Sequence, residues 1–432
     1  MVTFNDSKQI NHSKKSPLVL VNFNEVRPNN ATLKLLFERK IRFKIENDLQ
    51  FKQIFEQTDL DIEADEFILK LKSDLIPNPS FSFVNLTRIW NIPKKWVRAR
   101  EITPSNAPEL GTILNSLQST RIVKSDVSRK GTQLKLLLTL QGGQYALFKP
   151  MRYDRQYVPD GIYAGADRHN GEIVAFHLSR ILNMRKVPIV ASRNLNVLTE
   201  IKQVASESLS ATFINQTNQN GSFISNCFYG ECYYCNEYDS VCPDAAGHIE
   251  GAMILMLPLH YKLQRIRNPW QRTYRDNMKP RWENDSHYCL YVRKSIGTNN
   301  QERLLDMVET SIFDFIIQNA DRHHYEVFKD VSNSALLLID NGKSFGNASH
   351  DEITILFPLL QCCVIRNSTY QHLKKLSLIK ISRIINELLV NDPLWPLLTD
   401  DHIVAMDRRL VMILAAIEIC LETFNKNNVL KA

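Results

Sequence analysis

The sequence lacks any apolar run long enough to cross a membrane. A transmembrane helix needs about 18 or more consecutive apolar residues, whereas the longest runs here are ILMLPL (residues 254–259) and LVMILAAI (residues 410–417). The first residues, MVTFNDSKQINHSKKS, also lack the apolar core of a signal peptide. Taken alone, these absences indicate a cytosolic chain, and any attachment to a membrane would need a targeting segment that is absent from this sequence.

A strong charge of one sign, an internal repeat and a low-complexity tract are missing as well. The 432 residues carry a formal net charge of +7, with 44% hydrophobic and 23% charged residues, which is the composition of a globular protein. A net charge this small does not require a basic surface for polyanions, because a surface of mixed positive and negative charge gives the same total. We therefore expect no nucleic-acid partner. The length favours two or more domains or lobes.

A second C-x2-C pair is also absent, which counts against a zinc site. Eight cysteines are present, and CFYGECYYCNEYDSVC (residues 227–242) holds four of them at spacings of five, three and seven residues. Zinc ligands usually come in two closely spaced pairs, and the adjacent Cys362 and Cys363 suit two separate disulfides better than one metal ion. The even number of cysteines favours the secretory pathway over the cytosol.

N-x-[ST] sequons point the same way, although a chain rich in asparagine produces several of them by chance. They begin at Asn5, Asn11, Asn30, Asn85, Asn215, Asn220, Asn284, Asn347 and Asn367.

The chain divides into four parts by pattern. Residues 1–30 are polar and predict a tail or stalk. Apolar residues recur at three and four spacing over residues 31–72, as in Leu33, Leu36 and Phe37 and again in Phe51, Ile54 and Phe55, and they predict helices. The stretch PNPSFSFVNLTRIWNIPKKW (residues 77–96) predicts irregular structure because proline punctuates it. Residues 31–125 are therefore expected to be a helical N-terminal extension.

A β-rich lobe is expected over residues 126–253 and a helical lobe over residues 254–432. GTQLKLLLTLQGGQYALFKP (residues 131–150) is a hairpin pattern around two glycines, and HNGEIVAFHLSRIL (residues 169–182) follows as a helix. The last third carries three long helical patterns at residues 304–318, 372–389 and 402–420. The predicted class is α+β with two lobes.

A lysine closes the second strand of the hairpin. Lys149 stands next to a proline at the end of a buried strand, where an ammonium group is costly unless it meets an anion. Glu172 on the following helix is a candidate partner, since protein kinases use a strand lysine and a helix glutamate to hold the α- and β-phosphates of ATP. Alone, such a pair is more often a lysine that reaches solvent.

Lys135 adds a second cation to the same hairpin. A two-residue loop would place Lys135 and Lys149 on opposite faces of the sheet, and a three-residue loop would place them on one face. Both alternatives stay open from the sequence.

Two aspartates stand about one hairpin apart in NADRHHYEVF (residues 319–328) and ALLLIDNGKSFG (residues 335–346). Kinase catalytic loops space a base aspartate and a metal-binding asparagine five residues apart. Asp321 and Glu326 have this spacing, with a carboxylate in place of the amide. Asp340 ends an apolar strand, where kinases carry the aspartate that binds Mg²⁺ or Mn²⁺. Each acid alone is most simply a solvated loop residue, but their order along the chain indicates a kinase site.

Two further features have weaker implications. His323 and His324 are adjacent, so both cannot easily face one metal ion, and we expect them to form structural hydrogen bonds. The run MRYDRQYVPDGIYAGADRHN (residues 151–170) is either a loop that faces the substrate or a solvated linker.

Several of these stretches resemble the secretory-pathway kinase family that contains the Golgi casein kinase and the glycosaminoglycan xylosylkinase. The similarity spans about residues 96–420 and leaves out the first thirty residues. It is carried by GTQLK, LFKP, DRHNGEIVAFHLSRIL, CFYGECYYC, RNPWQRTYR, IFDFIIQNADRHHYE, LIDNGKSFG and PLLQCCVIR.

The resemblance implies a two-lobed, disulfide-stabilised, atypical kinase fold with ATP and Mn²⁺, or Mg²⁺, between the lobes. It implies that Asp321 is the catalytic base, and that Glu172, Asp340 and Glu326 lie at the metal. The residues it implies at ATP are Gln133, Lys135, Lys149, Ile254, Leu255, Met256, Leu257, Glu326 and Asp340, with residues 254–257 lining the adenine.

The resemblance also implies a disulfide pattern that spacing alone could not give. It pairs Cys227 with Cys242 and Cys232 with Cys235. Cys289 and Cys420 would each take one of Cys362 and Cys363.

Within the family, NADRHHYE, KSFGN and the CYYC spacing are more similar to the xylosylkinase than to the protein kinase, although Gly342 stands where a small alanine is expected. The implied reaction is phosphoryl transfer from ATP to the 2-hydroxyl of xylose in the proteoglycan linkage region, with galactosyl-xylose as acceptor, in the Golgi lumen. The alternatives are a secreted Ser/Thr protein kinase and a catalytically silent activator of a related kinase. The presence of Glu172 argues against lost activity, and a mere glycan-binding module would leave Asp321 and Asp340 unexplained.

Overall fold

Five antiparallel strands form the main sheet of the computed structural model, in the order β1-β2-β3-β7-β4. The structure describes residues 32–51, 62–78, 85–129, 131–158, 161, 167–217, 223–275, 278–297 and 300–432. The strands of the sheet are β1 (Ile122–Val127), β2 (Leu136–Leu140), β3 (Gln144–Pro150), β4 (Val190–Asn196) and β7 (His248–Leu255). The predicted tail at residues 1–30 lies outside the described residues.

The hairpin of β2 and β3 has the three-residue loop. Leu140 pairs with Gln144 and Leu136 pairs with Phe148, so the next position of the ladder sets Lys135 opposite Lys149 on one face. The loop needs its glycines, because Gly142 and Gly143 have φ angles of 88° and 80°, which side chains other than glycine rarely adopt. Of the two alternatives that the sequence left open, the structure contains the one that gathers both cations.

Two helices cover the edge strand β4 and its neighbour β7. These are α5 (Leu110–Ser119) and α6 (His169–Ile181), which both pack against β4 and β7. Every residue of α6 is buried. Arg180 near its end donates to the Asp74 carboxylate at 3.1 Å and to the Leu71 carbonyl at 3.0 Å, which ties α6 to α3 (Ile62–Ser73).

The free energy of unfolding should depend on pH through His177 of α6. Burial, helped by the nearby Arg180 charge, lowers the pKa of His177 to about 3. In the unfolded chain this pKa returns to about 6.5, so between these two values the unfolded state binds a proton that the folded state excludes, and stability falls as pH falls. His177 alone should lower the free energy of unfolding by about 2 kcal/mol between pH 7 and pH 5.

The variant His177→Gln should lose this part of the pH dependence. Urea unfolding of both proteins at the two pH values, with disulfides intact, measures it. Other buried histidines with a lowered pKa, such as His402, titrate in both proteins and cancel in the comparison. An equal loss of stability on acidification in the two proteins would contradict the assignment.

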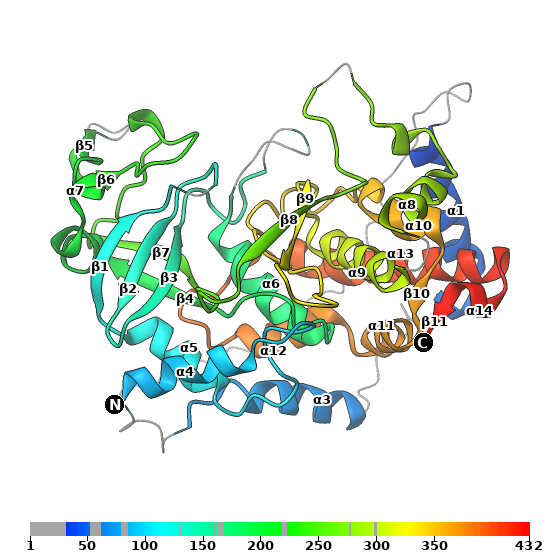
Figure 1. Cartoon of the computed structure of the whole chain (residues 1–432), viewed down its shortest axis with the longest axis horizontal. Helices are drawn as coiled ribbons and strands as arrows, with labels where there is room; N and C mark the ends of the chain where they lie inside the picture. Colours follow the sequence, from blue (N-terminus) through cyan, green and yellow to red (C-terminus); the bar gives the residue numbers. More distant parts are fainter. Residues whose placement is uncertain are drawn as a thin grey trace, which may run out of the picture. The chain divides into compact units, whose positions relative to one another are not determined.

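A group of helices lies to the right of the sheet in Figure 1. Helix α9, buried over nearly its whole length, and helix α13 pack against each other in its centre, and α1 packs on α13. The helices are α1 (Leu33–Asn47), α8 (Tyr288–Ile296), α9 (Gln301–Ile317), α10 (Phe357–Cys362), α11 (Asn367–Ile379), α12 (Ile381–Leu389), α13 (Asp400–Thr423) and α14 (Lys426–Val429). None of the helices in the described ranges has the length and apolarity that a bilayer span requires.

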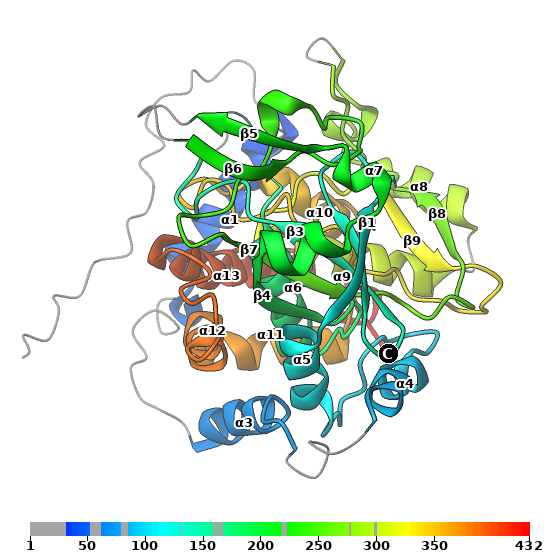
Figure 2. The ribbon, with the colours of Figure 1, turned by 90° about the vertical axis from the view of Figure 1, so that its left-hand side faces the viewer.

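The described residues also form three short sheets and one short helix. They are β5 (Phe213–Thr217) with β6 (Phe223–Phe228), β8 (Leu263–Arg267) with β9 (His324–Phe328), β10 (Ile365–Arg366) with β11 (Leu430–Lys431), and α7 (Glu207–Ser210). The turned view in Figure 2 shows β5 and β6 as a separate ribbon beyond the main sheet.

Four disulfides join all eight cysteines. Cys227–Cys242 and Cys232–Cys235 close the segment after β6, as the resemblance implied, and paired sulfurs leave no thiolate for zinc. Cys289 of α8 is bonded to Cys362 of α10, and Cys363 is bonded to Cys420 of α13. This settles which of the adjacent cysteines takes which partner.

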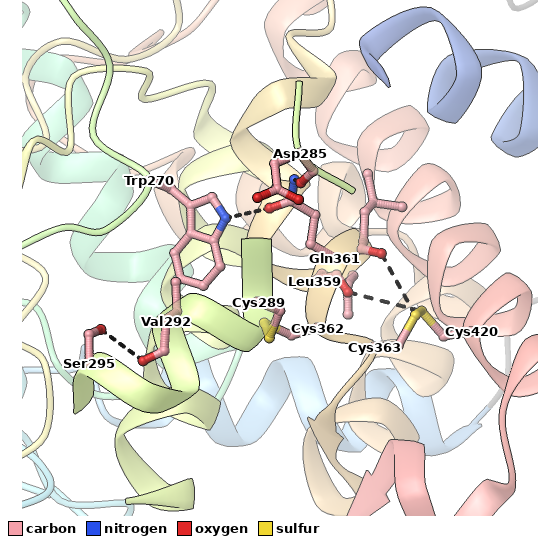
Figure 3. The surroundings of a disulfide bond; sticks show 11 residues. Trp270, Asp285, Cys289, Val292, Ser295, Leu359, Gln361, Cys362, Cys363 and Cys420 are labelled. Atoms are coloured by element: carbon pink, nitrogen blue, oxygen red, sulfur yellow. Dashed lines mark hydrogen bonds between the residues drawn. A yellow bond between two sulfur atoms is a disulfide. The ribbon is translucent and has the colours of Figure 1, made fainter. Parts of the chain in front are cut away.

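Hydrogen bonds between side chains and backbone lie close to the disulfides that join the helices (Figure 3). Trp270 Nε1 donates to Gln361 Oε1 at 2.7 Å, and Gln361 Nε2 donates to the Asp285 carbonyl at 3.0 Å. The loop that follows β8 is thereby held against α10, next to Cys362.

The expectation of irregular structure over residues 77–96 is wrong for its second half, because α4 (Leu86–Trp96) is a helix. The Asn85 side chain accepts from the Thr87 amide at 2.8 Å and caps its start. Ile89, Trp90 and Pro93 are buried on one face, and this burial outweighs the backbone bond that an interior proline removes. Residues 79–84 of the same stretch lie outside the described part, as do Ile54 and Phe55.

Candidate active site

Lys149 is surrounded by three carboxylates at the end of β3. Its Nζ lies 2.6 Å from Glu172 Oε1, 2.8 Å from Asp340 Oδ1 and 3.4 Å from Asp167 Oδ1. Burial disfavours the charged ammonium, but the three acids outweigh burial and raise the pKa of Lys149 well above its ordinary value. Lys149 is therefore a permanent cation whose pairing with Glu172 is the one predicted from the sequence.

Glu172 connects Lys149 with the backbone that follows Asp340. It lies in the first turn of α6, and its carboxylate accepts from the Asn341 backbone amide at 2.9 Å and from Asn341 Nδ2 at 3.3 Å. Asp340 itself has a φ of 59°, in the left-handed region that suits aspartate better than bulky residues. Lys149 lowers the pKa of Asp340 far below its ordinary value, and Lys135 adds to this effect.

A group of three carboxylates has the spacing of a metal site. Ligand oxygens of Asp167, Glu172 and Asp340 all lie within 4.8 Å of one another. Carboxylate oxygens are ligands that Mn²⁺ and Mg²⁺ prefer, so the donor set fits either ion. Glu172 and Asp340 were expected here from the sequence, whereas Asp167 was not.

Asp167 escaped detection because it lies in the stretch interpreted as a loop or linker. The sequence signal that could have identified Asp167 is its position in DRHNGE, five residues before Glu172. Gly342 makes room for it, since a Cβ at Gly342 would lie 1.5 Å from Asp167 Oδ1. The alanine expected at position 342 would therefore displace the Asp167 carboxylate from this position.

Glu326 lies outside that group of three. It sits on β9, where its Oε1 is 3.1 Å from Arg265 Nε and 3.3 Å from His324 Nε2. Its role as a ligand of metal or nucleotide stays a prediction.

Arg322 holds the loop of Asp321 next to Asp340. Its guanidinium is bonded to the Asp314 carboxylate of α9 at 2.9 and 2.7 Å and to Asn341 Oδ1 at 2.8 Å. It also donates to the carbonyl of Ile339. The arginine after Asp321 therefore serves to join the two aspartate segments, which the sequence alone did not reveal.

Asp321 is held by residues from three segments. The Asn319 side chain accepts from the Asp321 amide at 3.1 Å, and Lys343 Nζ lies 3.0 Å from Asp321 Oδ2. The Tyr274 hydroxyl donates to Asp321 Oδ1. His323 Nδ1 lies 2.8 Å from the Asp321 carbonyl oxygen, which agrees with the structural hydrogen bonds expected of the histidines.

An open cavity lies beside the loop of Asp321. Its wall combines aromatic rings with hydrogen-bonding groups, a combination that suits a polar ligand with apolar faces. Among the lining residues are Trp270, Arg272, Tyr274, Asn319, His323 and Thr354.

Half-buried apolar residues continue the site along the sheet. Leu137, Leu147 and Ile254 face one another across β2, β3 and β7, and they share the face of Lys149 because strand side chains alternate. Of the four residues predicted at the adenine, Ile254 has its side chain on this face. Leu255, Met256 and Leu257 line a different pocket, and their place at the adenine stays a prediction.

Gln133 and its surroundings lie just before β2. Gln133 accepts from Arg152 at 2.8 Å, and Arg152 also donates to Asp239 in the cysteine-rich segment. The Tyr234 amide donates to the Thr132 carbonyl at 3.2 Å. The cysteine-rich segment therefore braces the loop that carries Gln133.

Comparisons with known proteins agree on one family. A sequence model described as "Golgi casein kinase, C-terminal, Fam20" matches residues 88–429. The chain is 46% identical over 343 residues to a glycosaminoglycan xylosylkinase of Homo sapiens, covering 79% of this chain and 82% of that protein. It is 48% identical over 344 residues to a glycosaminoglycan xylosylkinase of Danio rerio, with the same coverage.

Solved structures give the same result. The structure of hydra Fam20 with sugar superposes with a TM-score of 0.74 at 40% identity, covering 79% of this chain and 98% of that one. The Golgi casein kinase with Mn/ADP bound superposes with a TM-score of 0.72 at 28% identity, covering 95% of each chain.

Proposed function

Since the chain belongs to the Fam20 family of Golgi casein kinases, we propose that it uses ATP and Mn²⁺ to phosphorylate the 2-hydroxyl of xylose in the proteoglycan linkage region. The α+β kinase fold with a β-rich and a helical lobe, expected from the sequence, is confirmed by its structural neighbours. The acceptor class rests on the two relatives named as xylosylkinases and on the neighbour solved with a sugar.

The observation that carries the proposal is the junction between Asp321 and the carboxylate group. Arg322 is bonded to Asn341, whose neighbour Asp340 belongs to the group of three acids, and Lys343 of the same segment reaches Asp321. A candidate base and a candidate metal site are thus adjacent, with the open cavity on the side of Asp321. Phosphoryl transfer needs this arrangement, because its catalysis is mainly positioning and charge neutralisation.

Each residue then has a role in the transfer. Asp167, Glu172 and Asp340 would hold Mn²⁺, which when bound neutralises the charge of the β- and γ-phosphates. Lys149 binds phosphate oxygens from the sheet side. Asp321 accepts the proton of the xylose 2-hydroxyl as its oxygen attacks the γ-phosphorus, and the bond between that phosphorus and the oxygen bridging to the β-phosphate breaks.

The remaining roles follow the same division. The face formed by Leu137, Leu147 and Ile254 would hold the adenine. We also propose Gln133, Lys135 and Glu326 as nucleotide-binding residues. The charge of Lys135, which lowers the pKa of Asp340, supports its place near the phosphates.

A competition assay distinguishes the acceptor classes. With labelled ATP and Mn²⁺, phosphate should appear on a galactosyl-xylose acceptor and hardly at all on an acidic serine-containing peptide offered beside it. Strong peptide labelling without sugar product would favour a secreted Ser/Thr protein kinase. Labelling of neither, with increased activity of an added related kinase, would indicate a silent activator.

Location and domain division are part of the proposal. Four disulfides support an oxidising compartment, and we place the protein in the lumen of the Golgi as a glycoprotein. We assign residues 126–253 to the nucleotide-side lobe and residues 254–432 to the helical lobe, with residues 31–125 as an extension that packs on both through α1 and α5.

A further inference from the structure

The two carboxylate oxygens of Asp321 have different kinds of partner. Lys343 Nζ lies 3.0 Å from Oδ2, and the Lys343 side chain is 24% exposed. The Tyr274 hydroxyl donates to Oδ1, and the Tyr274 side chain is 57% exposed. One partner is thus a cation on a mostly buried side chain and the other a hydroxyl group on a mostly exposed residue.

Lys343 comes from a firmly held segment. Asn341 on its N-terminal side is bonded to Glu172 at 2.9 Å, and Ser344 Oγ donates to the Asn341 carbonyl at 2.7 Å. The Phe345 amide donates to the Ile317 carbonyl of α9 at 2.8 Å. Bonds on both sides hold the backbone of Lys343 in the position from which its ammonium reaches Asp321.

Tyr274 comes from the loop between β8 and α8, which projects away from the β8–β9 ribbon in Figure 1. The loop is anchored at Trp270, whose Nε1 donates to Gln361 at 2.7 Å, and at Arg272, which donates to the Thr354 hydroxyl. Besides its bond to Asp321, the Tyr274 hydroxyl lies 3.5 Å from His323 Nδ1. Its exposure on this loop makes Tyr274 the partner of Asp321 that can be displaced.

A general base must accept a hydrogen bond from the hydroxyl that it deprotonates. The Tyr274 hydroxyl already makes this bond. We propose that Tyr274 fills the acceptor-hydroxyl position on Asp321 until the acceptor replaces it, while Lys343 orients Asp321 throughout. The two are positioning residues, and together they favour sugar over water as acceptor. This inference rests on the proposed kinase activity, but it concerns the choice between water and acceptor rather than the identity of the acceptor.

The competing reaction is hydrolysis of ATP. Water would give its proton to Asp321 as its oxygen bonds to the γ-phosphorus, and the bond to the bridging oxygen would break, leaving ADP and phosphate. Closed active sites suppress such side reactions by excluding water. Removing the Tyr274 hydroxyl leaves a hydrogen-bond acceptor on Asp321 and the space of one oxygen atom, which a water molecule fills.

The variant Tyr274→Phe therefore tests the proposal without any acceptor present. Phosphate release from ATP with Mn²⁺ should rise about tenfold, because water gains access to the base, while KM for ATP stays unchanged. Tyr291→Phe is the matched control, since Tyr291 is 51% exposed and lies on α8. Hydrolysis by Tyr274→Phe at the level of this control would overturn the inference.

Lys343 gives an independent readout. Lys343→Met should lower kcat for hydrolysis and for transfer together by about 100-fold, the usual cost of one preorganised charged group, with nucleotide affinity retained. Lys343→Arg should restore most of the loss. If Lys343→Met changes only KM for the acceptor, Lys343 binds sugar and does not orient the base.

Hydrolysis needs only ATP and Mn²⁺, so these outcomes are separable from the failure of the proposed function. If the acceptor proves to be a peptide, the rise in hydrolysis by Tyr274→Phe is still expected. A protein that neither hydrolyses ATP nor transfers phosphate, in any variant, would refute both.

Discussion

Replacing Asp340 by asparagine should weaken Mn²⁺-dependent ATP binding and abolish turnover together. Asp340 is one of the three acids within 4.8 Å of one another and lies 2.8 Å from Lys149. The change removes a charged ligand and also leaves Lys149 with one anion fewer. Mutation of a residue that only supports a metal ligand typically lowers metal affinity by about 10–100-fold. Removal of a charged ligand itself should therefore lower the affinity by about 100-fold or more.

Calorimetric titration of ATP with Mn²⁺ into the variant measures the affinity, and single-turnover rates measure the chemical step. Asp330→Asn is a suitable control, because Asp330 is exposed in a turn after β9 and belongs to no part of the site. Nucleotide affinity of Asp340→Asn equal to that of this control would remove Asp340 from the metal site.

Replacing Asp321 by asparagine should have the opposite profile. Nucleotide and metal affinity should stay nearly intact, because Asp321 is not one of the three clustered acids. The single-turnover rate should fall by about 10²–10⁴-fold, the typical contribution of a positioned general base. The amide keeps the size of the carboxylate, and Asn319 still accepts from the backbone amide of residue 321, so the loop should hold its position.

The same titration and single-turnover measurements serve for Asp321→Asn. The comparison of the two variants is the decisive result. A folding defect in Asp321→Asn would lower nucleotide binding as well as the rate, whereas loss of the base should lower the rate alone. If Asp321→Asn loses nucleotide affinity as severely as Asp340→Asn, the division of roles is wrong and Asp321 belongs to the metal site.

Local sequence was sufficient for the features that depend on neighbouring residues. Two apolar stretches around Gly142 and Gly143 predicted the β2–β3 hairpin, and Lys149 beside a proline marked a buried cation in need of an anion. Asp321 and Asp340 were recognisable because each ends or follows a strongly apolar element. The stripe Leu86, Ile89 and Trp90 would have predicted α4 too, had the prolines of the stretch not been taken as signs of irregular structure.

Tertiary structure alone decided which groups meet. Asp167, Lys343 and Tyr274 come from segments far apart in the chain, and each reaches its partner through packing that no local pattern encodes. The hairpin loop length, and with it the shared face of Lys135 and Lys149, depended on register with the rest of the sheet. The partner of Cys362 depended on the placement of α8 against α10. Residue types and short periods are local properties of a sequence, whereas distances between side chains are set by the burial of the whole core.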